Sequence, residues 1–122
     1  MVSAVLTKTH RVRSGADFKT TVRRGRRVTS DHAVIYVVGD STVGESLSPP
    51  TRFGFIVSKA VGGAVVRNIM RRRLRSVARE LLATCDRGNT VVVRMLPGSA
   101  ALSWGALSFE ISAAVAKAVG AR

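Results

Sequence analysis

The sequence predicts a single α+β domain in which helices pack against one mixed sheet of about four strands. The chain has 122 residues, enough for one hydrophobic core, and no shift in composition marks a second domain. Short apolar runs of strand length alternate with longer amphipathic patterns of helical period. Hydrophobic residues make up 46% of the chain, so burial can offset chain entropy. We therefore expect one folded domain over residues 1–122.

The N-terminal part begins with residues 1–14, which are typical of an extended basic arm. The segment GADFKTTVRRG, residues 15–25, predicts a short helix that Ser14 or Asp17 caps at its start. Gly25 marks the end of this helix as a C-cap glycine.

Two clear strands follow. Residues 33–38 (AVIYVV) and 52–58 (RFGFIVS) are apolar runs of strand length, and the polar stretch 40–51 between them predicts a loop because it contains glycine and proline. A further short strand is an option near Arg26–Thr29.

The C-terminal half adds two helices around a third strand. A helix is expected from residue 64 to about 84, a turn at 86–89, a strand at 90–96, a break at 97–99 and a last helix at about 101–119. The order is therefore α-β-β-α-β-α, with the optional short strand in addition. The strand, long helix and next strand form a βαβ unit, which general rules make right-handed.

The charge balance restricts the function classes. Lys and Arg total 20 against 7 Asp and Glu, a net charge of +13, which is typical of proteins that bind nucleic acid or anionic membranes. No apolar run approaches the roughly 20 residues that span a bilayer. Cys85 is the only cysteine, so no internal disulfide is possible. A cytoplasmic location is expected.

The stretch VVRNIMRRRLRSVAR, residues 65–79, contains six arginines and no acidic residue. At helical spacing, one stripe is apolar and predicts the buried side: Val66, Met70, Leu74, Val77 and Leu81. The other side forms one polar, cationic face: Arg67, Asn68, Arg71, Arg72, Arg75 and Arg79. Arg73 points away from this face. Interfacial membrane helices favour Trp or Phe on the apolar side, which this stripe lacks.

The cationic face repels itself. Arginines three or four positions apart destabilise a helix by about 0.2–0.5 kcal/mol per pair, whereas solvated helices interleave glutamates to gain the same amount. No acidic residue occurs between Glu45 and Glu80. The pattern favours a polyanion-binding face over a solubilising surface. Asn68 lies within it, either as a contact to a ribose or base edge or as a surface residue without a role.

The segment SKAVGGAVVRNIMRRRLR resembles the signature of the bacterial ribonuclease P protein family. The matching positions are Ser58, Lys59, Gly62, Ala64, Val65, Arg67, Asn68, Arg71, Arg72 and Arg75. An N-terminal segment of the family is also matched, by Arg11, Arg13, Asp17, Phe18, Arg23 and Gly25. The chain departs from the pattern at Val22, where a second aromatic is common, at Gly63, where Asn is common, and at Ile69 and Met70, which replace one commonly basic position.

The resemblance implies the protein subunit of an endoribonuclease, the ribonuclease P holoenzyme, which removes the 5′ leader of precursor tRNA. It implies two partners, the catalytic ribonuclease P RNA and precursor tRNA, and no DNA or membrane. Magnesium ions held mainly by the RNA would run the chemistry, with no catalytic or metal-binding residue from this chain. It also implies a left-handed βαβ crossover, contrary to the general rule.

The resemblance assigns site residues in two groups. Contacts to the RNA subunit fall on Lys59, Arg67, Asn68, Arg71, Arg72, Arg75 and Arg79. Contacts to the single-stranded leader fall in a cleft between the first helix and the sheet, on Phe18, Tyr36, Arg11, Arg13, Lys19 and Arg23. Phe18 and Tyr36 would stack on unpaired bases, and the alternative for both is ordinary core packing.

Other function classes have less support in the sequence. The seven carboxylates are scattered, and neither histidine has an acidic partner at useful spacing, so no acid/base pair is apparent. A ribosomal or ribosome-associated protein that binds rRNA remains the main alternative, because composition alone does not separate the two. A DNA-binding module would normally require a helix-turn-helix partner, and here a strand precedes the basic helix.

Overall fold

A computed structural model describes residues 11–12, 14–39, 50–83 and 88–120. Its elements follow one another along the chain as α1 (Gly15–Arg24), β1 (Arg26–Thr29), β2 (Ala33–Gly39), β3 (Arg52–Ile56), α2 (Ala64–Leu81), β4 (Asn89–Met95), the short 3-10 helix η3 (Ser99–Ala101) and α3 (Trp104–Gly120). The α+β prediction is confirmed, and the optional strand at Arg26–Thr29 is present. The expected arm at 1–14 and loop at 40–51 lie mostly outside the described residues.

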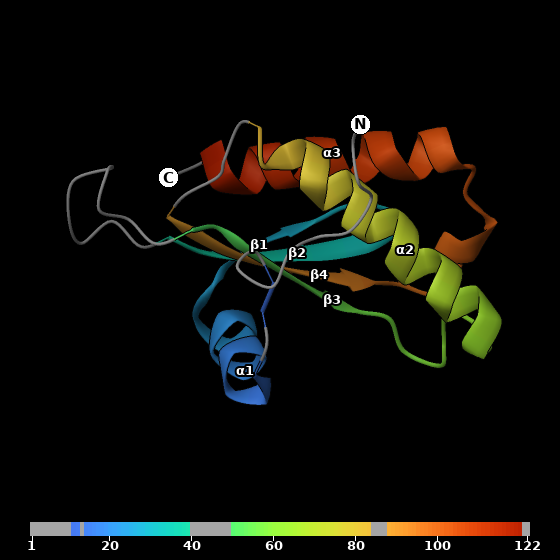
Figure 1. The fold of residues 1–122 in the computed structure, drawn as a ribbon, viewed down its shortest axis with the longest axis horizontal. Coiled ribbons are helices and arrows are strands. Elements are labelled where there is room, and N and C mark those ends of the chain that lie inside the picture. The colour runs from blue at the N-terminus through green and yellow to red at the C-terminus, as the bar shows by residue number, and fades with distance from the viewer. Residues whose placement is uncertain (1–10, 13, 40–49, 84–87, 121–122) are drawn as a thin grey trace.

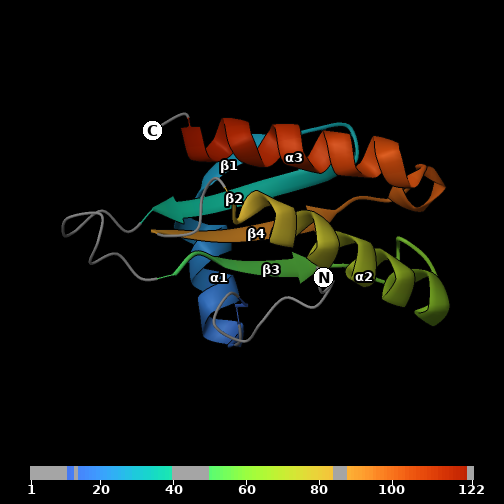
Figure 2. The ribbon, with the colours of Figure 1, turned by 45° about the horizontal axis from the view of Figure 1, so that its top comes forward.

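The four strands form one mixed sheet in the order β1-β2-β4-β3. β2 pairs antiparallel with both β1 and β4, whereas β3 and β4 are parallel. In Figure 2, β3 points to the right, β4 lies directly above it and α2 crosses in front of both. With the strands turned to point upward, the connection through α2 therefore moves to the left, so this βαβ unit is left-handed. The general rule fails for this unit, and the expectation from the family resemblance holds.

The sheet separates two unequal layers (Figure 1). α2 and α3 lie side by side on one face and contact each other, whereas α1 lies on the opposite face against β2 and β4. The main core fills the space between the sheet and the α2–α3 layer. Its largest fully buried side chains are Phe53, Ile35, Leu74, Leu107 and Ile111. With so few aromatics, this core rests on aliphatic packing.

Helix α1 begins and ends at the predicted positions. The Ser14 hydroxyl accepts a hydrogen bond of 3.0 Å from the backbone N–H of Asp17, so Ser14 is the N-cap. At the other end, the N–H of Gly25 donates to the carbonyl of Thr21 at 2.8 Å. A Cβ on Gly25 would lie 2.5 Å from that carbonyl oxygen. Glycine is required here because the chain turns tightly into β1.

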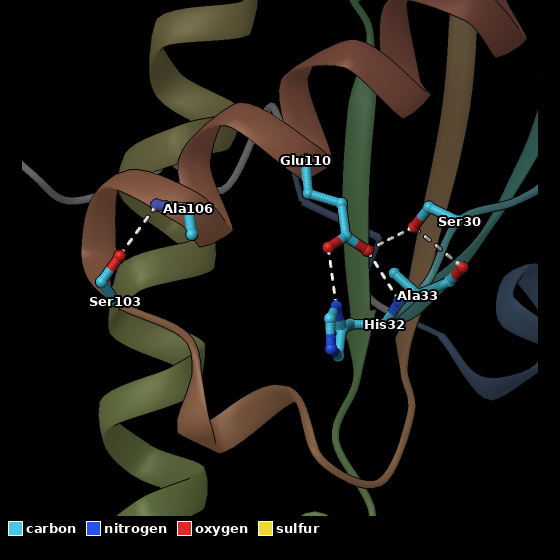
Figure 3. Close-up of polar contacts among 6 residues, drawn as sticks. All are labelled: Ser30, His32, Ala33, Ser103, Ala106 and Glu110. Atoms are coloured by element: carbon cyan, nitrogen blue, oxygen red, sulfur yellow. Dashed lines mark hydrogen bonds and ion pairs between the residues drawn. The ribbon is translucent and has the colours of Figure 1, made fainter.

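The long helices end differently from the prediction. α2 stops at Leu81 instead of near residue 84, and α3 starts at Trp104 instead of about 101. Residues Ser99–Ala101 form a 3-10 turn first, and the Ser103 hydroxyl then accepts from the N–H of Ala106 at 3.1 Å, which caps α3 (Figure 3). The alanine-rich pattern alone did not reveal this polar start.

A polar cluster around the carboxylate of Glu110 connects the β1–β2 turn to α3 (Figure 3). Glu110 on α3 accepts hydrogen bonds from the Ser30 hydroxyl at 2.6 Å and from the His32 backbone N–H at 2.7 Å. Its other oxygen lies 2.8 Å from Nδ1 of His32. Partial burial acts to raise the pKa of Glu110, but the hydrogen bonds from Ser30 and His32 outweigh it and hold the pKa below its ordinary value.

We expect Glu110→Ala to lower the free energy of unfolding at pH 7 by about 1–3 kcal/mol, because several partly buried partners lose their acceptor. The pKa of Glu110 is lower in the folded than in the unfolded chain, so this carboxylate stabilises the fold above the unfolded pKa, about 4.3. The contribution is lost as the pH falls through the folded pKa. Urea unfolding across pH 7 to 3 measures both effects.

The control is Glu80→Ala, because Glu80 is exposed on α2 and has no ion pair among the described residues. We expect it to change the unfolding free energy by less than about 0.5 kcal/mol. Equal losses from the two variants, or a Glu110→Ala effect independent of pH, would contradict the role of the cluster.

Candidate RNA interface

The expected basic face lies on the outer side of α2. Met70, Leu74, Val77 and Ala78 are buried against the core, so the opposite side of the helix faces outward. Lys59, Asn68 and Arg72 are exposed, whereas the remaining four residues of the face are half-buried: Arg67, Arg71, Arg75 and Arg79. The structure thus places six of the seven predicted RNA-subunit contacts on one helix, with Lys59 on the segment that leads into it.

Val66 was predicted in the buried stripe of α2, and this is wrong. Its side chain is 38% exposed. Val66 lies in the first turn of the helix, where it packs over Gly62: a Cβ added to Gly62 would meet a Val66 methyl at 2.7 Å. Periodicity identified the correct side of the helix, but its first turn extends beyond the core that the later turns cover.

Two arginines of the face are held by the segment that precedes α2. Nε of Arg67 donates to the carbonyl oxygen of Gly62 at 3.2 Å. The Arg71 guanidinium donates to the carbonyl of Val57 and to the amide oxygen of Asn68, both at 3.4 Å. Each guanidinium has five N–H donors, so most remain available for an external acceptor. These contacts orient Arg67 and Arg71 before any ligand arrives.

The face has no carboxylate partner among the described residues. The two ion pairs among the described residues join His32 to Glu110 and Arg52 to Asp17, and neither involves α2. The first turn of α2 also lacks an acidic residue, although the helix dipole favours one there. Charges that the described residues leave uncompensated can be neutralised by an external polyanion.

The predicted leader-binding aromatics come from the opposite side of the sheet. Phe18 on α1 is half-buried and lies against Gly54 of β3: a Cβ on Gly54 would meet the edge of the Phe18 ring at 2.6 Å. Tyr36 on β2 is only 6% exposed. The ring of Phe18 is therefore accessible in part, whereas Tyr36 belongs mainly to the packing beneath α1.

The predicted basic contacts to the leader are not gathered at one point. Lys19 and Arg23 are exposed, and both line a shallow hollow on α1 together with Ala16, Thr20 and Arg24. Arg11 is half-buried where the chain runs beside β3, forming a bridge with Phe53. Arg13 lies outside the described residues.

Sequence reasoning missed one cation on the sheet face beside α1. Arg94 of β4 is exposed and pairs in register with Val34 of β2 and Ile56 of β3, which are half-buried. The three side chains share the sheet face on which Gly54 and Tyr36 lie, because side chains alternate along each strand. The alternation in NTVVVRM carried this signal: Arg94 falls in phase with Val92 and Thr90, away from the main core.

In the described part of the chain, no three His, Cys, Asp or Glu side chains lie close enough to hold a metal ion. No helix in that part is both long and apolar enough to cross a membrane.

Fold and surface together define a small basic RNA-binding domain: a mixed sheet with a left-handed βαβ unit and an arginine-rich helix on its outer layer. The family model for Ribonuclease P matches residues 6–119. The chain therefore belongs to the ribonuclease P protein family. It is the protein subunit of ribonuclease P, the ribonucleoprotein that processes tRNA, and the ribosomal alternative is not favoured.

Relatives support this assignment, and solved structures match the fold. The chain is 45% identical over 115 residues to the ribonuclease P protein component of Clavibacter michiganensis, covering 94% of this chain and 97% of that protein. It is also 45% identical to that of Streptomyces avermitilis, covering 91% and 93%. The fold matches the RNase P protein of Staphylococcus aureus (TM-score 0.75, 21% identity, 91% and 98% covered). That of Thermotoga maritima also matches (TM-score 0.70, 18% identity, 84% and 91% covered).

Proposed function

We propose that the outer face of α2 binds the catalytic RNA of ribonuclease P. The observation that carries this proposal is the cationic face without a carboxylate partner among the described residues. The guanidinium fork fits phosphate oxygens in pairs, and the hydrogen bonds of Arg67 and Arg71 to backbone carbonyls favour one orientation of each, which lowers the entropy lost on binding. Asn68 is exposed between them and contributes an amide for a ribose or base edge.

We further propose that the sheet face beside α1 receives the 5′ leader of precursor tRNA. Phe18 offers a partly exposed ring for stacking, and Val34 and Ile56 extend an apolar floor on which Arg94 supplies a charge. Lys19 and Arg23 are exposed on α1, and Arg11 lies beside β3. Arg13 is included in the proposal with these three. Tyr36 is buried, so in this proposal it packs behind the apolar surface and does not stack on a base.

The chemistry belongs, in this proposal, to the RNA and its magnesium ions. We assign no reaction step to the residues of this chain. Their contribution is electrostatic. A catalytic RNA and an RNA substrate repel each other, and a subunit with a net charge of +13 that contacts both lowers this repulsion. The proposed place of action is the cytoplasm.

Salt dependence tests the electrostatic proposal. If five α2 arginines neutralise phosphates of the catalytic RNA, log K should fall with log salt at a slope of about −3.5 to −4.5, because each contact contributes about 0.7–0.9. Titration of the protein into the cognate ribonuclease P RNA at several salt concentrations measures this slope. A slope near zero, or equal affinity for ribosomal RNA of similar length, would overturn the proposal.

A further inference from the structure

The first turns of α2 expose aliphatic side chains. Val65 is 73% exposed, Ile69 is 43% exposed and Val66 is 38% exposed. Single exposed apolar residues are common on protein surfaces, but these three are neighbours on one stretch of helix. We call Val65, Val66 and Ile69 the apolar patch. The described residues cover it only in part: Val66 packs over Gly62, and the buried side of the helix begins with Met70.

The apolar patch is continuous with the cationic face. Val65 lies three residues before Asn68, and Ile69 lies three residues before Arg72. Residues at these separations are neighbours on a helix surface. Asn68 and Arg72 are exposed, so aliphatic, amide and guanidinium groups form one outward surface.

The surrounding charge restricts what can cover the patch. A second copy of this chain would bring its own arginine face against this one, with no carboxylate on either face to offset the repulsion. RNA instead presents both complements at once: phosphates for the arginines and, where nucleotides are unpaired, ribose and base surfaces that aliphatic groups can contact. The patch therefore fits the same polyanion as the arginines beside it.

We propose that the apolar patch packs against the ribose or base surface of an unpaired nucleotide in the catalytic RNA. The arginines then anchor the flanking phosphates, and Asn68 contacts the edge of the same nucleotide region. This inference rests on the proposed function, because it assumes that α2 faces the catalytic RNA. It adds a binding component that salt does not screen, since apolar burial does not depend on counterion release.

The test is the double variant Val65→Thr/Ile69→Thr. Threonine keeps the β-branched shape and has a similar helix propensity, so the fold should be retained, as circular dichroism checks. Both positions are exposed in the free protein. We expect the affinity for the cognate ribonuclease P RNA to fall about tenfold at every salt concentration, with the slope of log K against log salt unchanged.

Two controls make the result specific. Phe109→Thr removes a side chain that is 78% exposed on α3, and it should leave both affinity and slope unchanged. Arg72→Ala should reduce the magnitude of the slope by about 0.7–0.9, since it removes one phosphate contact. The two kinds of contact are thereby distinguished by their response to salt.

The inference is overturned if the double variant binds as tightly as the wild type. It is also overturned if the loss of affinity disappears at high salt, because the slope of log K against log salt has then become smaller. It is also overturned if sedimentation shows a wild-type dimer that the double variant abolishes, because the patch would then bind a second copy. Failure of the wild type itself to bind the RNA, or a wild-type slope near zero, would instead reject the proposed function.

Discussion

Replacement of Arg72, Arg75 and Arg79 by alanine is expected to weaken binding to the catalytic RNA by at least about 10³-fold, because charged hydrogen bonds contribute about 1.5–3 kcal/mol each. The slope of log K against log salt should shrink by about 2.1 to 2.7. The free protein should become slightly more stable, since like-charge neighbours such as Arg75 and Arg79 no longer repel. RNA titration and thermal unfolding measure these opposite changes.

Arg73→Ala is the matched control for the triple variant. It removes one charge from the same helix, but Arg73 lies apart from the cationic face, so only a small loss of affinity from long-range attraction is expected. Suppose that Arg73→Ala loses as much binding free energy as the triple variant loses for each arginine removed. Net charge, and not the cationic face, would then determine binding.

The second large effect is expected at Gly54. In Gly54→Val, the new Cβ would lie 2.6 Å from the Phe18 ring and 3.0 Å from Cβ of Val12, so the ring must leave its place on the sheet. Overpacking of this kind costs about 1–3 kcal/mol. We expect a lower unfolding free energy and weaker binding of precursor tRNA, with affinity for the catalytic RNA alone unchanged, because α2 lies on the other face.

Gly105→Ala provides the control for this substitution. A Cβ at Gly105 meets nothing within 4 Å, and the position lies in α3, so alanine should leave the protein as stable as the wild type or slightly more stable. The preference for precursor over mature tRNA, measured with each variant holoenzyme, isolates the leader contact. An unchanged preference in Gly54→Val would contradict the placement of the leader beside Phe18.

The sequence predicted the elements because each carried a local signal. The apolar runs of β2 and β3, the Ser14 cap and the period of α2 depend on neighbours in the chain. The crossover hand and the strand order depend on long-range packing, which no local pattern encodes. The general rule accordingly gave the wrong hand, and the family resemblance supplied the correct one.

The candidate site was predictable to different degrees on the two sheet faces. The cationic face is made of one helix, so its spacing alone brought its residues together. The face beside α1 is assembled from α1, β2, β3 and β4. Its strand residues become neighbours only through the pairing register of the sheet. Arg94 was therefore missed, and the burial of Tyr36 could not be read from its neighbours in the sequence.

The placement of α1 and α2 on opposite faces of one sheet sets a spacing. The proposed leader site lies on the sheet face beside α1, and the cationic face lies on the outer side of α2. Packed layers lie about 10 Å apart and a helix has a radius of about 5 Å, so the two sites are roughly 15 Å from each other. The Debye length is about 8 Å at physiological ionic strength. Two polyanions held at these sites would sense each other's charge only weakly through solvent. The sheet thus works as a spacer as well as a scaffold.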